Sequence, residues 1–105
     1  MPFVYILECS DGSLYVGRTW DLERRIGEHQ EGLGAAYTAT RRPVRLVYYE
    51  ESARIDAAYA REKQIQGWSR VKRLALINGD LDALRRASRK PRRVQEGREE
   101  RIGDN

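Results

Sequence analysis

The residues of this chain that could do chemistry include a tyrosine, an arginine and its only histidine, all within one short stretch. Tyr15, Arg25 and His29 lie in residues 14–29, LYVGRTWDLERRIGEH, which we predict to form a strand that runs into a helix. Arg25 and His29 are four residues apart, so their side chains share one face of the predicted helix. A tyrosine has an unperturbed pKa of about 10 and is a poor base at pH 7 unless a cation such as Arg25 lowers that value.

A second phenol, Tyr5, is expected close to the first. It lies in residues 3–8, FVYILE, which are β-branched and aromatic and therefore typical of a strand. The Asp11-Gly12 pair favours a tight hairpin turn into the strand that carries Tyr15. The two phenols could therefore share one face or one end of a sheet, although two aromatic residues that merely pack across strands would give the same pattern.

Glu62 could supply a carboxylate to the same chemistry. It lies four residues after Ala58 and three before Ile65, so it falls on or beside the apolar stripe of a predicted helix. A buried carboxylate is costly unless it is paired or bound to a cation. The spacing leaves two interpretations open: an ion pair with a nearby Arg or Lys, or a metal ligand or general acid/base.

The elements that must position these residues follow from composition and turn signals. Gly17, inside a strand pattern, indicates a bulge or the close approach of another group to the backbone. Arg25 and His29 should border the core, where an arginine can also be a surface residue whose stem lies on apolar neighbours. The expected strands cover residues 3–8, 14–18 and 44–50, and the expected helices cover residues 22–30, 52–66 and 69–77, followed by a short helix capped by Asp80.

Basic side chains gather at two places that could contact a polyanion. In the loop of residues 32–43, aromatic, hydroxyl and cationic groups are interleaved, a mixture that suits a phosphate backbone and also an ordinary polar loop. The helix of residues 69–77 has a basic edge, which is also what a solvated face looks like. The residues concerned are Tyr37, Thr38, Arg41 and Arg42 in the loop, and Arg70, Lys72 and Arg73 on the helix.

The net charge of +4 on this chain of 105 residues is unevenly distributed. Residues 1–84 hold 12 Lys/Arg and 12 Asp/Glu, whereas residues 85–105 hold 8 and 4. Apolar residues nearly vanish after Arg86, so we predict one folded domain of residues 1–86 and a basic, disordered tail of residues 87–105. Such a tail suggests a polyanionic partner, most simply nucleic acid, or is only a solvated segment.

Several other classes of protein are disfavoured. Cys9 is the single cysteine, so an internal disulfide is excluded, and no Cys/His spacing of a metal site is present. The apolar start MPFVYIL is too short for a signal peptide, and no run approaches the roughly 18 apolar residues of a membrane span. We therefore expect a soluble, cytoplasmic protein with no membrane partner and no evident obligate protein partner.

Taken in order, six fragments of the sequence resemble the GIY-YIG nuclease superfamily and, more narrowly, its small single-domain bacterial branch. The resemblance covers about residues 3–78, and it rests on the order and spacing of the fragments rather than on any one of them. The first triplet has valine where the superfamily has glycine, a change that this branch tolerates. The fragments are Val4-Tyr5-Ile6, Tyr15-Val16-Gly17, Leu22-x-x-Arg25-Ile26-x-x-His29, Tyr37-Thr38, Pro43-Val44-x-Leu46 and Arg61-Glu62-Lys63.

The resemblance implies an α/β fold of the α+β type, in which a small three-stranded antiparallel sheet is flanked by helices. It implies a metal-dependent endonuclease that hydrolyses phosphodiester bonds in DNA, structure-selective or weakly sequence-specific, with DNA repair or recombination as its context. DNA is favoured over RNA as the partner, and Mg²⁺ over Mn²⁺ as the cofactor. The alternatives are a non-catalytic nucleic-acid-binding module on the same scaffold and a plain structural or interaction protein.

The resemblance also implies individual catalytic roles. Tyr5 is similar to the tyrosine proposed as general base or as positioner of the attacking water, with Tyr15 beside the scissile phosphate. Arg25 is similar to the cation that stabilises the charge developing on phosphorus, and Glu62 to the single protein ligand of the metal. Hydrolysis of a phosphodiester needs these functions: an activated water, charge neutralisation and stabilisation of the leaving oxygen.

The remaining implied residues support this site or contact its substrate. His29 and Tyr37 are expected to orient the others. Asn78 is the candidate for an asparagine that often follows the metal-binding glutamate, although an Asn-Gly pair also has a plain structural reason at a helix end. The residues expected to contact nucleic acid are Gly17, Arg18, Thr38, Arg41, Arg42, Lys63, Arg70 and Lys72.

Overall fold

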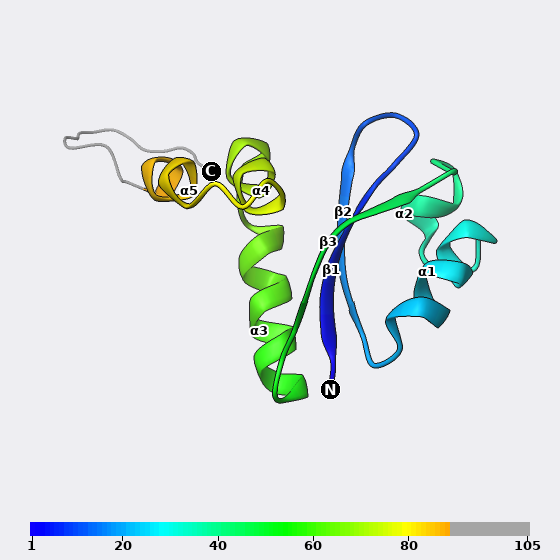
Figure 1. The fold of residues 1–105 in the computed structure, drawn as a ribbon. Coiled ribbons are helices and arrows are strands. Elements are labelled where there is room, and N and C mark those ends of the chain that lie inside the picture. Colours follow the sequence, from blue (N-terminus) through cyan, green and yellow to red (C-terminus); the bar gives the residue numbers. More distant parts are fainter. Residues whose placement is uncertain (89–105) are drawn as a thin grey trace. The chain divides into compact units, whose positions relative to one another are not determined.

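The computed structural model describes residues 1–88, which fall into two compact units that divide after Gln66 (Figure 1). The observed class is the expected α+β fold with a three-stranded antiparallel sheet. Residues 36–39 form a short helix inside the predicted loop, and the predicted helix of residues 52–66 begins three residues later. The elements are β1 (Phe3–Glu8), β2 (Leu14–Thr19), α1 (Leu22–Gln30), α2 (Ala36–Ala39), β3 (Arg45–Glu51), α3 (Ile55–Gln66), α4 (Arg70–Ile77) and α5 (Leu81–Ser88).

The sheet of the first unit has the order β2-β1-β3, so β2 is an edge strand. The hairpin between β1 and β2 places Tyr5 opposite Gly17 and Leu7 opposite Tyr15. The predicted turn contains Gly12, whose φ of 84° lies in the left-handed region that favours glycine. Because side chains alternate between the faces of a strand, this register puts both predicted site tyrosines on the same face of the sheet.

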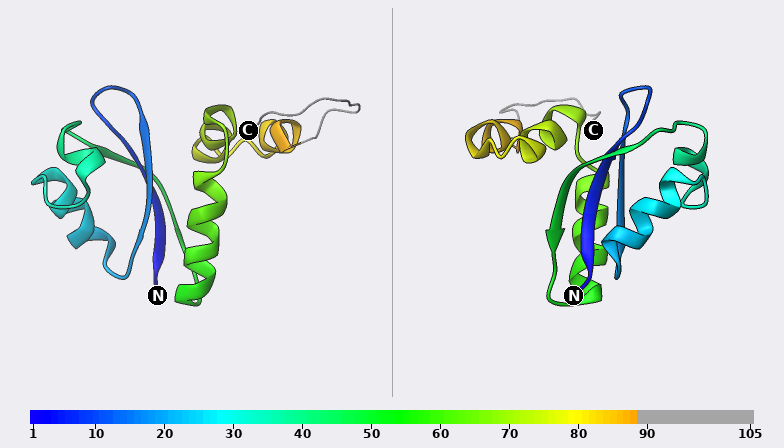
Figure 2. Two further views of the ribbon diagram at one scale, coloured as in Figure 1. Left: turned by 180° about the vertical axis from the view of Figure 1, so that it is seen from behind. Right: turned by 45° about the vertical axis from the view of Figure 1, so that its right-hand side comes forward.

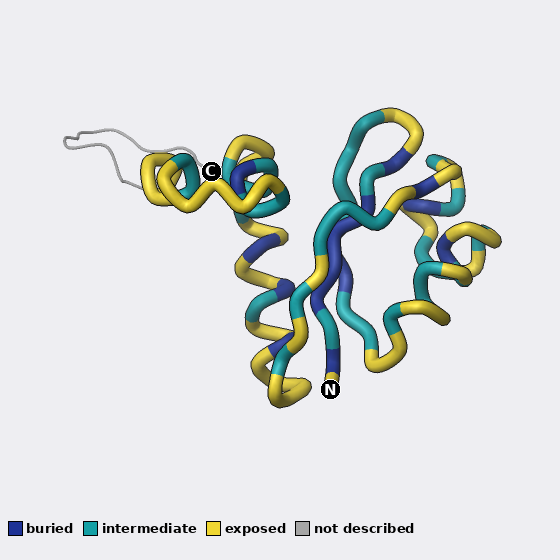
Figure 3. Tube along the Cα trace, viewed as in Figure 1, coloured by how far each residue is buried: buried dark blue, intermediate teal, exposed yellow. Residues whose placement is uncertain are grey.

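The two faces of the sheet are covered by different helices. Figure 2 shows α1 and α3 on opposite sides of the sheet. The face that carries Tyr5 and Leu7 forms a core cluster with Leu22 and Ile26 of α1. The other face is packed by α3, whose buried residues include Glu62. The central strand β1 is buried along most of its length (Figure 3), because helices cover both faces of the sheet there.

Helix α1 begins where the sequence predicts. Asp21 is its N-cap and accepts a hydrogen bond from the backbone N–H of Arg24 at 3.1 Å. The helix ends one residue after His29, which is fully buried although a border position was expected. Its last turn therefore delivers an imidazole to the core face of the sheet.

The described part of the second unit consists of α4 and α5, which pack against each other. Ser69 caps α4 by accepting from the backbone N–H of Lys72 at 3.2 Å. Helix α5 extends to Ser88, and residues 89–105 lie outside the described residues, so the predicted limit at residue 86 and the basic tail beyond it stay predictions. Across residues 1–88, none of the helices combines the length and apolarity that a membrane span requires.

Candidate active site

The predicted catalytic residues gather around the edge strand β2. Tyr5 and Tyr15 project from the face that α1 covers, whereas Arg18 pairs with Glu62 on the α3 side. Gly17 lies on the side of the two tyrosines, because a Cβ at this position would lie 2.5 Å from the Tyr5 hydroxyl oxygen. The close approach predicted at Gly17 is therefore the phenol of Tyr5, and any larger residue would displace it.

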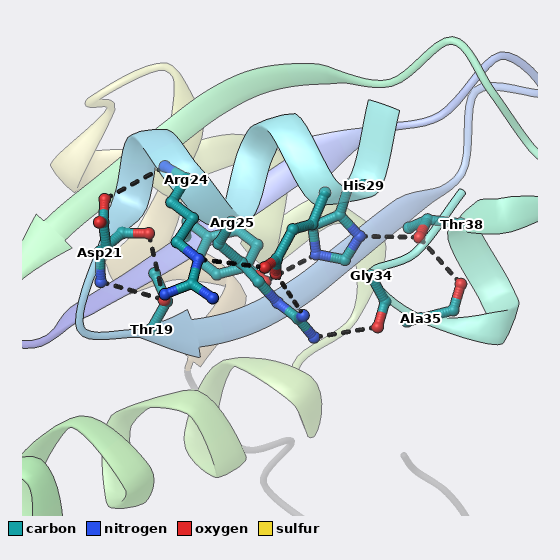
Figure 4. A network of polar contacts seen from close by, with 10 residues as sticks. Thr19, Asp21, Arg24, Arg25, His29, Gly34, Ala35 and Thr38 are labelled. Carbon is teal, nitrogen blue, oxygen red and sulfur yellow. Dashed lines mark hydrogen bonds and ion pairs between the residues drawn. The ribbon is translucent and has the colours of Figure 1, made fainter. Parts of the chain in front are cut away.

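A chain of three hydrogen bonds runs from Tyr5 through His29 and Thr38 to Ala35. Figure 4 shows its part from His29 to Thr38 and Ala35. The Thr38 hydroxyl donates its only proton to the carbonyl oxygen of Ala35 at 3.1 Å. It must then accept the bond that joins it to His29 Nδ1 at 2.8 Å, so Nδ1 carries the imidazole proton. His29 Nε2 is left as the acceptor of the Tyr5 hydroxyl, also at 2.8 Å.

The electrostatics of these hydrogen-bonded side chains differ from the expectation that a cation such as Arg25 lowers the pKa of the tyrosine. Burial raises the pKa of Tyr5 to about 12, and the nearby Arg25 guanidinium offsets only part of that rise. The reason is that removing the phenolate from water costs more free energy than its attraction to one partly solvated arginine supplies. Burial and the Arg25 charge also lower the pKa of His29, so the imidazole is neutral at pH 7 and can accept a proton.

The titration of His29 can be followed on its own because it is the only histidine of the chain. Its native pKa lies below the ordinary 6.5, so the stability due to the neutral imidazole is fully present above pH 6.5 and is lost as the pH falls through the native pKa. We expect the imidazole Cε1–H resonance of the folded protein to titrate with a midpoint below 6.5. A midpoint at or above 6.5 would contradict the buried neutral imidazole.

The aromatic neighbours of His29 form a row that leads towards solvent. The Tyr15 ring lies 5.2 Å from the His29 ring and 6.5 Å from that of Tyr5, measured between centroids. Tyr37 stacks on Tyr15 at 6.1 Å, and Arg41 lies 3.8 Å above the Tyr37 ring. Packing of aromatic residues across strands is thus present, and the Tyr5–His29 hydrogen bond exists in addition to it.

Arg25 is held beside this row by two acceptors. Its guanidinium donates to Glu28 at 3.0 Å and to the carbonyl oxygen of Gly34 at 3.1 Å, and 30% of its side chain remains exposed. A Cβ on Gly34 would lie 2.3 Å from His29 Nδ1. Gly34 is therefore a site residue that the sequence reasoning missed, and the Gly-Leu-Gly run in the predicted loop is the signal that could have indicated it.

Glu62 forms the ion pair that one of its two interpretations predicts. Its Oε1 pairs with Arg18, and its Oε2 accepts from Gln66 at 3.1 Å, with 9% of the Glu62 side chain exposed. Residues 1–88 contain no group of three or more Asp, Glu, His or Cys arranged to hold a metal ion. The donor set still fits Mg²⁺, which binds through one or two carboxylates and completes its shell with water and substrate oxygens. A metal role for Glu62 stays a prediction.

The other predicted contacts with nucleic acid have varied surroundings. Thr38 is fully buried and its hydroxyl is committed to His29 and Ala35, so it is placed to position the imidazole rather than to touch a ligand. The rest remain predictions. Arg41 pairs with Asp11 at 3.1 Å, and Arg42 donates to backbone oxygens of Ala39 and Gln30. Lys63 lies near the Tyr59 ring, Lys72 lies near the Trp68 ring, and Arg70 is exposed in α4. Asn78, the candidate for the asparagine that follows the metal-binding glutamate, is the C-cap of α4, and its role also stays a prediction.

This arrangement can be compared with known proteins. The model of the GIY-YIG catalytic domain matches residues 1–75. The chain belongs to the GIY-YIG family. GIY-YIG domains form a nuclease superfamily whose members generally use divalent metals. The matched residues 1–75 include the positions of all six candidate catalytic residues.

Relatives within the GIY-YIG family are proteins of similar size. A UPF0213 protein of Haloquadratum walsbyi is 48% identical over 80 residues, which cover 76% of this chain and 90% of that protein. One of Staphylococcus saprophyticus is 49% identical over 76 residues, covering 72% and 93%. The solution NMR structure of the UPF0213 protein BH0048 from Bacillus halodurans is 38% identical with a TM-score of 0.50, covering 86% of this chain and all of that one.

Proposed function

We propose that this GIY-YIG protein is a metal-dependent endonuclease that hydrolyses phosphodiester bonds in DNA. The observation that carries the proposal is the hydrogen bond from the Tyr5 hydroxyl to the neutral His29 Nε2, with Arg25 beside it. A tyrosine with only a structural role would not need a neighbouring imidazole in the one tautomer that can accept its proton. The alternative of a non-catalytic binding module gives this pairing no use.

Activation of the attacking water is assigned to Tyr5 and His29 together. With a pKa of about 12, Tyr5 is not ionised at pH 7 and cannot act as a base alone. It can take a proton from water while its own proton passes to His29 Nε2, which becomes imidazolium. The hydroxide then attacks phosphorus, and Nδ1–H stays bonded to Thr38. General-base catalysis of this kind contributes about 10²–10⁴-fold.

Arg25 is assigned to the charge that develops on the phosphoryl oxygens. Its partners Glu28 and Gly34 fix the guanidinium in place before substrate arrives, so little reorganisation is needed during the reaction. The exposed part of its side chain faces the solvent from which a phosphate would approach. Tyr15 and Tyr37 are assigned to the substrate side of the site, where their rings form the wall that leads out from His29.

Glu62 would hold the divalent metal, Mg²⁺ or Mn²⁺, on the α3 side of the edge strand. When bound, such an ion neutralises phosphate oxygens and stabilises the leaving oxygen. Gln66 orients the carboxylate by donating to its Oε2 and also to the Val16 carbonyl oxygen at 3.2 Å. Because a metal ion held by a single carboxylate completes its ligand shell with substrate oxygens, this site should assemble fully only on DNA.

The finer parts of the proposal concern the substrate and its setting. Flexible, branched or damaged DNA is the proposed target, in repair or recombination, and a cytoplasmic location is proposed with it. The cations assigned to phosphate contacts act without sequence preference, so DNA binding should weaken steeply with salt. These cations are Arg18, Arg41, Arg42, Lys63, Arg70 and Lys72, with the Gly17 backbone beside the scissile group.

A substrate panel tests the function. The full chain is incubated with labelled plasmid, single-stranded, flap and four-way-junction DNA, and with a matched RNA, in Mg²⁺ and in EDTA. We expect cleavage of at least one DNA in Mg²⁺ and none in EDTA. Salt-dependent binding of every substrate without any cleavage would overturn the nuclease and favour the binding module. Absence of binding at low salt would overturn both.

A further inference from the structure

We propose that Arg18 competes with a divalent cation for the carboxylate of Glu62, and that a nucleic-acid phosphate relieves this competition by drawing Arg18 away. The inference rests on the proposed function, because it concerns how the proposed metal site opens. It gives Arg18 a regulatory role in addition to its proposed phosphate contact.

The first observation is the ion pair itself. Arg18 occupies Oε1 of Glu62 while Gln66 occupies Oε2, so both carboxylate oxygens are already bonded. Glu62 has 9% of its side chain exposed, whereas Arg18 has 35%. A buried carboxylate needs a partner of opposite charge, and Arg18 supplies it. Arg18 places a positive charge on Oε1, where a divalent cation would also bind, so charge repulsion should make each weaken the binding of the other.

The second observation is the ring that lies against Arg18. The guanidinium carbon lies 4.6 Å from the centroid of Tyr59, a residue that the sequence reasoning did not assign. Lys63 lies 5.3 Å from the same ring, on the same helix as Glu62. Arg18 is therefore held both by a carboxylate and by an aromatic face, and either contact alone is weaker than the two together.

The third observation is an alternative place for the guanidinium. A surface depression of about 360 Å³ is lined by Arg18, Arg24 and Arg25. Arg24 and Arg25 both pair with Glu28 there and Asp21 also lines the depression, so with Arg18 it holds three cations and two carboxylates. A phosphate in this depression would give Arg18 a second anion to bind within reach of its partly exposed side chain. DNA and the cation should then strengthen each other's binding.

Metal binding in the absence of DNA tests the competition. Mn²⁺ is titrated into the wild type and the Arg18→Gln variant, and free Mn²⁺ is measured by its EPR signal. We expect about tenfold tighter binding by the variant, within the usual range of coupling between sites. Arg45→Gln removes an equal charge on β3, where Arg45 pairs with Glu8, and should change the affinity less than about twofold. Equal affinities of wild type and Arg18→Gln, or equal gains in both variants, would overturn the competition.

A second variant tests the competition even if Arg18→Gln does not fold. Tyr59 is half-exposed, and Tyr59→Leu keeps every charge while loosening Arg18. It should tighten Mn²⁺ binding by about two- to fivefold, the energy of one exposed cation–π contact. Unchanged affinity in Tyr59→Leu, when Arg18→Gln does not fold by circular dichroism, would also overturn the proposal.

The cleavage assay separates this proposal from the function on which it rests. Metal-dependent cleavage by the wild type, with no gain of Mn²⁺ affinity in Arg18→Gln, would overturn the competition and leave the nuclease. A gain in Arg18→Gln without cleavage of any DNA would support the competition and overturn the nuclease. No detectable Mn²⁺ binding by either protein without DNA would overturn the competition, and the nuclease would then be judged by the cleavage assay alone, because the proposed site assembles fully only on DNA.

Discussion

Replacing Tyr5 by Phe is expected to lower single-turnover DNA cleavage by about 10²–10⁴-fold, the contribution of a general base. The substitution removes only the hydroxyl that bonds to His29 Nε2 at 2.8 Å. Water can then no longer lose its proton through the phenol to the imidazole. The unpaired Nε2 in a buried site should also cost about 1–3 kcal/mol of unfolding free energy, measured by urea denaturation.

Tyr48→Phe is the matched control for this variant. Tyr48 also has its pKa raised to about 12, by burial and by its bond to Glu50, but it lies opposite Ile6 and therefore on the other face of the sheet from Tyr5. It should keep cleavage within about threefold of wild type, because its hydroxyl bonds to Glu50 and to none of the proposed reacting groups. Equal losses of cleavage in the two variants would show that the effect is structural and would contradict the role of Tyr5.

Replacing Arg25 by Gln is the second large expected effect, a loss of about 10²–10³-fold in cleavage. Gln is long enough to stay near Glu28, but it has no positive charge to stabilise the phosphoryl oxygens. The loss should fall mainly on the rate at saturating DNA rather than on DNA affinity, because the charge is needed only as the reaction proceeds.

Arg24→Gln is the control for this second prediction. Arg24 also pairs with Glu28, at 3.3 Å, but its side chain is largely exposed and it does not contact Gly34. Its replacement should weaken DNA binding slightly and leave the saturated rate within about threefold. An Arg24 variant as slow as the Arg25 variant would mean that Glu28, rather than the Arg25 charge, is what the reaction requires.

The parts of the fold that the sequence predicts well are those with strong local signals. The β-branched and aromatic residues of β1 and the Asp-Gly turn involve neighbours in sequence, and both the strand and the turn are found where they were expected. The α+β class and the family also follow from short fragments in order. Helix α2 was missed because four residues give too short a pattern to separate it from a loop.

The parts that the sequence could not predict depend on contacts between distant segments. The tautomer of His29 follows from Thr38 and Ala35, which α2 brings to it. The choice of Arg18 as the partner of Glu62 joins residues 44 positions apart. The rise in the Tyr5 pKa comes from burial under α1, which no spacing of charges reveals.

The most direct test of the proposed nuclease compares wild type, Glu62→Gln and Glu50→Gln on the best DNA of the panel, each with Mg²⁺ and with EDTA. Glu50 is a matched carboxylate, partly buried and paired with Arg61, but on β3. The account predicts Mg²⁺-dependent cleavage by wild type and Glu50→Gln, and a loss on the order of a thousandfold in Glu62→Gln, since the metal contributes several kcal/mol. Cleavage by folded Glu62→Gln at the wild-type rate, or undiminished cleavage in EDTA, would contradict it.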